Sequence, residues 1–144
     1  LGLGARVAAI KLGDRGLYLR TRDDLAPMGR GTPSDPQRWR GRELWAPCFR
    51  VAVAGTVGAG DATIAGLLAG VLRAQAPEAA LTSAVAVGAC CVEAPDATGG
   101  VRGWRQTQER IRRGWPRLDA RVTGSGWSWD EEAGLWRGPR DHGD

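Results

Sequence analysis

The chain has 144 residues, enough for one domain with a hydrophobic core but short for an enzyme with separate substrate and cofactor lobes. Its 20 basic and 16 acidic side chains give a net charge of +4, and 17 of the basic ones precede residue 119. Because the basic residues are scattered, the sequence favours a solvated arginine-rich surface over a nucleic-acid footprint. Three cysteines without a CxxC pair and the single His142 support neither a zinc site nor a disulfide framework.

The sequence contains no secretory apolar region and no apolar run of about 18 residues, so we expect no contact with a membrane and a reducing, cytoplasmic setting. The chain begins with Leu1, and its only methionine is Met28. We therefore expect a native start, and an N-terminal portion of the protein, to lie outside this sequence.

The first half of the chain predicts three strands. Short apolar runs on either side of a glycine-rich turn predict a strand pair over 6–11 and 16–21. The stretch 22–47 is polar and rich in proline and glycine, which is typical of a long surface loop. Alternating apolar and small or polar residues predict a third strand over 49–54.

The second half predicts three helices and a tail. Apolar residues at helical spacing predict a helix over 59–74, whose many small residues favour close packing against a neighbour. Further helices are expected over 77–91 and over 104–114, the last one amphipathic and on the surface. From residue 118 to 144 glycines interrupt every pattern, so we expect an irregular tail that is either flexible or lightly docked by its tryptophans.

The segment 55–61 reads GTVGAGD and stands between the predicted third strand and the first helix. The first backbone N–H groups of a helix have no partner within it and lie at the positive end of its dipole, so they form an anion site. Gly58 and Gly60 would let a phosphate approach the backbone. Asp61 would repel that phosphate, so its place makes sense if it accepts the proton of a hydroxyl that attacks the phosphoryl group. Helix capping, or a favourable place in the first turn of the helix, explains Asp61 equally well.

Two other phosphate-binding motifs fit this segment less well. The Walker loop needs GK[ST] after its glycines, whereas Asp61 and Ala62 stand there. The dinucleotide-binding pattern GxGxxG needs a glycine at the position of Thr63.

Two motifs resemble those of the ribokinase-like (PfkB) carbohydrate kinases. The residues of 56–61, followed by Ala62-Thr63 and Ala65-Gly66, are similar to the family signature DTxGAGD. The stretch 11–16, KLGDRG, resembles the family's KxGxxG strand and turn. The resemblance spans residues 6 to about 115 and implies an α/β fold, the C-terminal part of a ribokinase-like sheet covered by helices. It divides the chain into a nucleotide-binding and catalytic part over 1–117 and the tail over 118–144.

The resemblance implies transfer of a phosphoryl group from ATP, with Mg²⁺, to a hydroxyl of a small sugar or sugar acid. Asp61 would be the catalytic base, and the backbone N–H groups of Gly58, Ala59 and Gly60 would form the anion hole for the γ-phosphate. The turn residues Lys11, Gly13 and Gly16 would lie beside the nucleotide. Cys90 belongs to the segment 87–91, in the place of the family's helix near the adenine, where plain helix packing explains it equally well.

The chain departs from the family pattern in two ways. Gly55 stands where the signature has its leading aspartate, which in many members helps to hold a monovalent cation. The N-terminal half of the family, which supplies the sugar contacts and the lid, is absent. A truncated, non-catalytic nucleotide-binding remnant or interaction module is therefore the alternative function, and an arginine-rich nucleic-acid binder is a distant third. The oligomeric state stays open, with a homodimer among the options.

Overall fold

The structure is a computed structural model that describes residues 1–25, 28–119 and 122–143. Within this part of the chain, helices and strands succeed one another as β1 Val7–Lys11, β2 Leu17–Thr21, β3 Glu43–Ala46, α1 Ala59–Leu72, α2 Pro77–Cys91, α3 Trp104–Arg112, β4 Ser128–Asp130 and β5 Leu135–Arg137. The strand pair and the three helices predicted from the sequence are confirmed, with ends that differ by no more than two residues.

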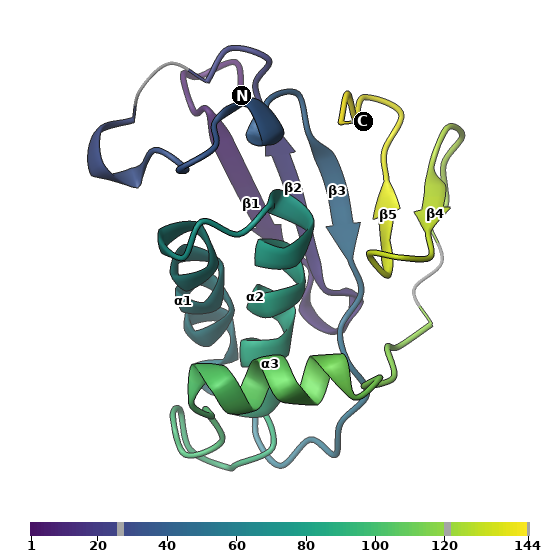
Figure 1. Ribbon diagram of the computed structural model, residues 1–144. Coiled ribbons are helices and arrows are strands. Elements are labelled where there is room, and N and C mark those ends of the chain that lie inside the picture. The colour runs from purple at the N-terminus through teal and green to yellow at the C-terminus, as the bar shows by residue number, and fades with distance from the viewer. Residues whose placement is uncertain (26–27, 120–121, 144) are drawn as a thin grey trace.

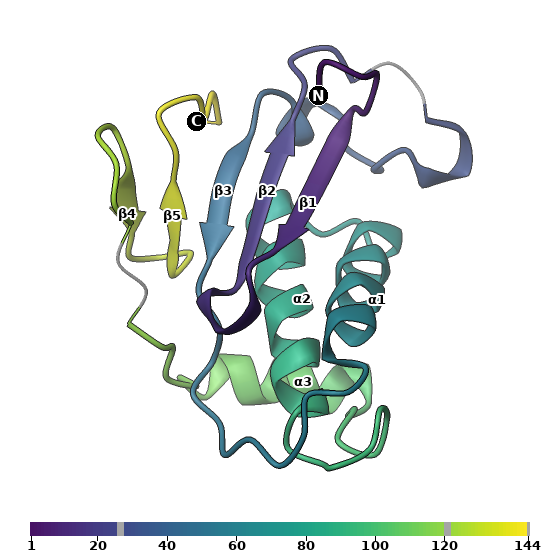
Figure 2. The ribbon, with the colours of Figure 1, turned by 180° about the vertical axis from the view of Figure 1, so that it is seen from behind.

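The strands form one antiparallel sheet in the order β1-β2-β3-β5-β4. Helices α1 and α2 lie against one face of β1, β2 and β3, and α3 crosses near one end of α2 (Figure 1). Figure 2 shows the opposite face of these strands, which none of the described helices covers. The α/β fold with helices on a sheet is thus confirmed, in a form with one helical layer.

The core fills the space between the sheet and α2. Leu17 and Leu19 of β2 and Leu44 of β3 are completely buried, because alternate residues of a strand point to the same face. Leu81 and Val85 of α2, four residues apart, meet them from the helical side. Full burial of one such side chain contributes about 1.5–3 kcal/mol to folding.

Helices α1 and α2 approach each other closely, as the small residues of α1 predict. A Cβ added at Gly66 would lie 3.0 Å from the α-carbon of Ala84, and one added at Gly88 would lie 2.1 Å from Oγ1 of Thr63. The outer side of α1 has no such neighbour in the described chain, and Leu68 and Leu72 are 56% and 75% exposed there.

Two predictions for the stretch between β2 and α1 are wrong. Residues 43–46 of the predicted loop form β3, a strand too short to show an alternation in sequence. The strand predicted over 49–54 is absent, and only Phe49 forms a β-bridge there, to Arg117. Its alternating pattern lacks a neighbouring strand: the N–H groups of Arg50 and Ala54 donate to Pro116 and Val92 in loops.

The prediction of an irregular tail is wrong for residues 128–137, which form the hairpin of β4 and β5. This hairpin extends the sheet beyond β3, and Leu135 is completely buried. Trp127, just before β4, packs on Tyr18 and Trp45 with ring centroids 6.3 and 6.0 Å apart. Strands of three residues leave no periodic signal, and tertiary packing supplies the order that the local sequence does not show.

A buried ion network joins the last residues to the body of the protein. Arg42 donates from Nε to Asp141 over 2.8 Å and from Nη2 to Glu78, and Arg137 donates to Asp141 over 2.8 Å. The side chains of Arg42 and Asp141 are only 4% and 3% exposed. Because a buried charge needs its partner, the network fixes the end of the chain against β3 and α2.

We expect this network to make stability depend on acid pH. Burial raises the pKa of Asp141, but hydrogen bonds from Arg42, the N–H of Glu43 and Arg137 outweigh burial, so the pKa lies below its ordinary value. A depressed folded-state pKa stabilises the fold above the unfolded pKa of about 3.9, and this stabilisation is lost as pH falls through the folded value. Denaturant unfolding measured between pH 7 and pH 2 should therefore show a smaller loss of stability for Asp141→Asn than for the native chain. Parallel pH profiles would contradict the assignment.

Candidate active site

The turn before α1 adopts a backbone that glycine alone permits without strain. Gly58, the N-cap residue, has a φ of 75°, and a Cβ at this position would lie 2.6 Å from the carbonyl oxygen of Ala97. The chain can therefore turn sharply at Gly58, and α1 begins at Ala59.

The beginning of α1 offers free hydrogen-bond donors. In the part of the chain that the structure describes, the N–H groups of Gly58, Gly60 and Asp61 have no acceptor, whereas the N–H of Ala59 donates to Thr56 over 3.3 Å. Three neighbouring free donors at the positive end of a 14-residue helix have the chemistry to bind an anion. Among the predicted hole residues, Ala59 would need to give up its turn bond before it could bind an anion.

Lys11 brings a positive charge to the same place. It is the last residue of β1, and its ammonium group lies so near Gly60 that a Cβ there would be 2.5 Å from Nζ. The two motifs that lie some 45 residues apart in sequence thus meet in space. An ammonium group beside free N–H donors strengthens the attraction for an anion such as a phosphate.

The turn that follows Lys11 closes tightly over β3. Gly16 has a φ of 102°, and a Cβ on it would lie only 2.0 Å from the carbonyl oxygen of Ala46. Gly13 accepts a hydrogen bond from the Cys48 thiol at 3.5 Å. Burial, together with the charge of Asp14, raises the pKa of the Cys48 thiol, so this side chain is neutral at pH 7. The turn therefore forms a rigid wall.

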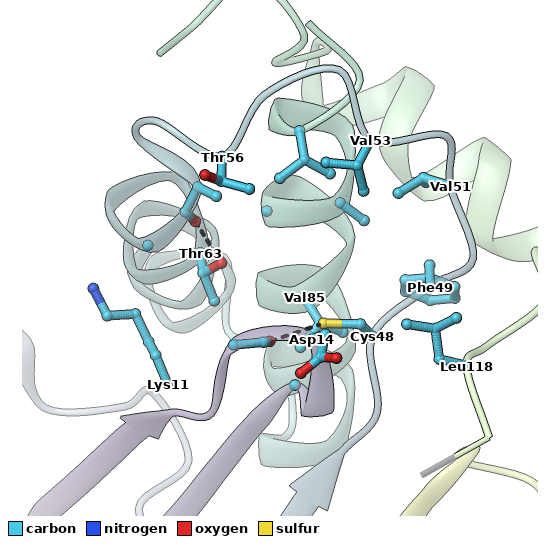
Figure 3. A pocket seen from close by; sticks show the side chains of 17 residues that line it. Lys11, Asp14, Cys48, Phe49, Val51, Val53, Thr56, Thr63, Val85 and Leu118 are labelled. Atoms are coloured by element: carbon cyan, nitrogen blue, oxygen red, sulfur yellow. Dashed lines mark hydrogen bonds between the residues drawn. The ribbon is translucent and has the colours of Figure 1, made fainter. Parts of the chain in front are cut away.

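A cavity of about 350 Å³ runs between this turn, the segment before α1 and helix α2. Lys11, Thr56 and Thr63 lie at one end of it, and Phe49 and Leu118 lie at the other (Figure 3). Phe49, Val51 and Leu118 make the second end apolar, and Val53, Val85 and Val92 add to the apolar lining. One cavity thus combines a lysine and backbone donors at one end with an apolar slot.

Most of the predicted site residues meet at this cavity. Lys11, Gly13, Gly16, Ala59 and Gly60 line it. The side chain of Cys90 does not: it is completely buried and lies 3.9 Å from the guanidinium of Arg110. Helix α2 reaches the cavity through Val85, Gly88 and Ala89 instead.

Asp61 is exposed and lies outside the cavity lining, one residue beyond Gly60. Its carboxylate has no hydrogen-bond partner in the described chain, and the N-cap of α1 has no side-chain cap. The Asp61 side chain thus does not cap the helix, but it lies in the first turn of α1, where the helix dipole favours a carboxylate. The carboxylate stands free next to the anion site, accessible from outside.

The surroundings of Gly55 explain why this position, the first of the signature, has no aspartate. A Cβ on Gly55 would lie 2.8 Å from the carbonyl oxygen of Pro95 and 3.0 Å from that of Ala94. The loop after α2 occupies the space that a longer side chain would need. This chain therefore has no room for a carboxylate at the first position of the motif.

Several wall residues could not be found from the sequence. Phe49 precedes the glycine segment by a few residues, but nothing local distinguishes it from a core phenylalanine. Leu118 falls in the predicted tail, where no motif points to a site. Both are adjacent to the cavity only because the segments before α1 and after α3 run side by side, joined by the bridge from Phe49 to Arg117.

Comparison with known proteins identifies the family. The sequence profile described as pfkB family carbohydrate kinase matches residues 2–102. The match covers more than half of the chain, so the protein belongs to this family of carbohydrate kinases, as the two motifs indicate. Among curated proteins, none is significantly similar to the chain.

Solved structures show the same fold. Ribokinase from Thermotoga maritima is 20% identical, with a TM-score of 0.58 over 77% of this chain and 31% of its own. A nucleoside kinase of the ribokinase family from Methanocaldococcus jannaschii is 20% identical, with a TM-score of 0.59 over 75% of this chain and 30% of its own. Aminoimidazole riboside kinase from Salmonella enterica, in complex with aminoimidazole riboside and an ATP analogue, is 29% identical. Its TM-score is 0.57 over 75% of this chain and 32% of its own. The chain thus spans about a third of each relative.

The described residues contain no helix long and apolar enough to cross a membrane. They also contain no group of three or more histidine, cysteine or acidic side chains placed to hold a metal ion.

Proposed function

We propose that this chain is the nucleotide-binding and catalytic part of a kinase that transfers a phosphoryl group from ATP to a hydroxyl of a small sugar or sugar acid. The observation that supports this most is that Lys11 lies beside Gly60 at one end of a cavity, next to the free N–H groups of Gly58, Gly60 and Asp61 at the start of α1. The triphosphate would lie at this end, and the base would occupy the apolar end near Phe49.

Asp61 would act on the acceptor. Because its carboxylate is exposed and outside the cavity, the acceptor hydroxyl would approach from the open side while ATP fills the cavity. Asp61 would take the hydroxyl proton as the oxygen bonds to the γ-phosphorus and ADP leaves. The N–H groups and Lys11 would stabilise the negative charge on the transferring phosphoryl oxygens.

Mg²⁺ would enter with ATP. The described chain offers no cluster of acidic ligands, and Mg²⁺ at such sites is held mainly by substrate phosphates and water. When bound, it neutralises charge on the transferring phosphates. The direct partners of the chain would then be ATP and the acceptor, without nucleic acid or membrane, in the cytoplasm.

The remainder of a full-length kinase would supply the acceptor site. Two observations support this: the chain spans about a third of its structural relatives, and Leu68 and Leu72 are exposed on the outer side of α1. A contiguous apolar surface on a soluble domain is typical of an interface. The alternative, a non-catalytic remnant, differs in one respect only: phosphoryl transfer stays absent when the missing part is restored.

The anion site can be tested on the chain itself with inorganic tripolyphosphate and ATP as probes. We expect Lys11→Met to weaken both ligands by about tenfold or more, because a hydrogen bond to a charged group contributes about 1.5–3 kcal/mol. Isothermal titration calorimetry gives the dissociation constants, and Arg30→Met, in an exposed turn, is the matched control. Equal affinities in the native chain and Lys11→Met would contradict the assignment, as would no binding of either probe to the native chain.

A further inference from the structure

Arg117 is a half-buried cation, and among the described residues it has no carboxylate partner. Its Nη1 donates to the carbonyl oxygen of Pro47 over 2.7 Å, and its Nη2 donates to Oγ1 of Thr82 over 2.9 Å. None of the ion pairs found among the described residues includes it, and burial lowers its pKa to about 10. A partly desolvated guanidinium that is held by two neutral acceptors and no carboxylate points to a role for the position.

Arg117 begins a series of stacked groups. Its guanidinium lies over the ring of Phe49, 4.4 Å from the centroid, and Phe49 stacks on Trp115 with centroids 4.5 Å apart and planes inclined by 20°. Arg110 lies over Trp115 at 3.5 Å and is itself held by Glu93 through two hydrogen bonds of 2.6 and 2.7 Å. Each group in the series therefore restricts the movement of the group stacked on it.

The series ends at the cavity. Phe49 and Leu118 form the wall farthest from Lys11, as Figure 3 shows. Phe49 is only 3% exposed, and because Arg117 and Trp115 cover the two faces of its ring, the ring borders the cavity with its edge. Arg117 also fixes the backbone just before Phe49 through Pro47, and the indole N–H of Trp115 fixes the backbone just after it by donating to Arg50 over 2.9 Å. The orientation of the Phe49 ring is thus set from three directions.

We propose that Arg117 is a positioning residue that holds Phe49 as a rigid apolar wall for the base of the bound nucleotide, an inference that rests on the proposed function. A guanidinium suits this role because its plane stacks on the ring while its fork reaches two acceptors at once. Arg117, Trp115 and Leu118 all follow residue 102, where the family profile ends, so the family motifs do not account for them.

The two ends of the nucleotide would bind to different parts of the cavity, so their contributions to affinity can be measured separately. Inorganic tripolyphosphate can use only the end with Lys11 and the free N–H groups, whereas ATP uses both ends. Loss of the wall should therefore weaken ATP without affecting tripolyphosphate. A general loss of structure would weaken both, so the ratio of the two affinities distinguishes positioning from folding.

The experiment measures the dissociation constants of ATP and tripolyphosphate for the native chain, Arg117→Met and Arg117→Lys. The control is Arg113→Met, because the side chain of Arg113, the C-cap residue of α3, is 77% exposed. We expect Arg117→Met to weaken ATP about tenfold and tripolyphosphate less than twofold, with Arg113→Met unchanged. Arg117→Lys should restore little of the ATP affinity, because an ammonium group cannot lie flat on the Phe49 ring and also donate to two separate acceptors. Unchanged ATP affinity in Arg117→Met, equal loss of both ligands, or full recovery by lysine would overturn the proposal.

A second variant keeps the test open if Arg117→Met does not fold. Phe49→Leu removes the flat ring, retains an apolar side chain and leaves Arg117 in place. It should show the same selective loss of ATP, and equal ATP affinity in a folded Phe49→Leu chain would overturn the proposal. Failure of the native chain to bind either probe would instead overturn the proposed function.

Discussion

Asp61→Asn, introduced into the full-length kinase that we propose, should lower kcat by about 10²- to 10⁴-fold and leave the dissociation constant of ATP unchanged. Asparagine keeps the size and the turn but cannot accept the proton of the attacking hydroxyl. ATP binding should persist, because the carboxylate lies outside the cavity and the free N–H groups and Lys11 remain. Steady-state kinetics and nucleotide titration measure the two quantities.

The control for this prediction is Asp35→Asn, the same chemical change at an exposed loop position. It should leave kcat within about twofold, as expected of surface substitutions. A capping aspartate gives a different result, since asparagine caps a helix about as well and turnover would hardly change. Turnover of Asp61→Asn within a few-fold of the parent would therefore exclude the catalytic role.

Deletion of residues 119–144 should destabilise the chain by several kcal/mol. The deletion removes Leu135, whose burial contributes about 1.5–3 kcal/mol. It also removes Asp141, and loss of one partner from a buried ion pair costs about 3–5 kcal/mol. These losses together are comparable with the whole stability of many domains, about 5–15 kcal/mol.

Denaturant unfolding followed by tryptophan fluorescence measures this effect. Glu131→Ala, at an exposed position in the turn between β4 and β5, is the control and should change stability by less than about 0.5 kcal/mol. An irregular tail, as the sequence pattern predicts, would instead leave the unfolding midpoint of the truncated chain unchanged.

The fold could be predicted where periodicity is strong and local. Helices α1 and α2 show apolar residues at helical spacing, and the turn between β1 and β2 is marked by glycines at 13 and 16. Strand β3, with four residues, and the hairpin of β4 and β5, with three residues each, are too short for such a pattern. These strands form because β3 pairs with β2, because β5 pairs with β3, and because Arg42 and Asp141 form a buried ion pair. A local sequence window contains none of these contacts.

The site could be predicted only where its residues form a motif. GTVGAGD and KLGDRG reveal the anion end because glycines and a charged residue must occupy fixed positions there. The apolar end has no such requirement, since any side chain of suitable shape can form a wall. Phe49, Leu118 and Arg117 therefore carry no signal in sequence, and Cys90, chosen from the resemblance, lies off the cavity that its neighbours line.

A crystal structure of the chain with a non-hydrolysable ATP analogue and Mg²⁺ tests the central claim most directly. The account predicts the terminal phosphate within hydrogen-bond distance of the N–H groups of Gly58, Gly60 and Asp61 and of the Lys11 ammonium, with the base against Phe49. A well-ordered nucleotide whose phosphates lie away from the beginning of α1 would contradict it.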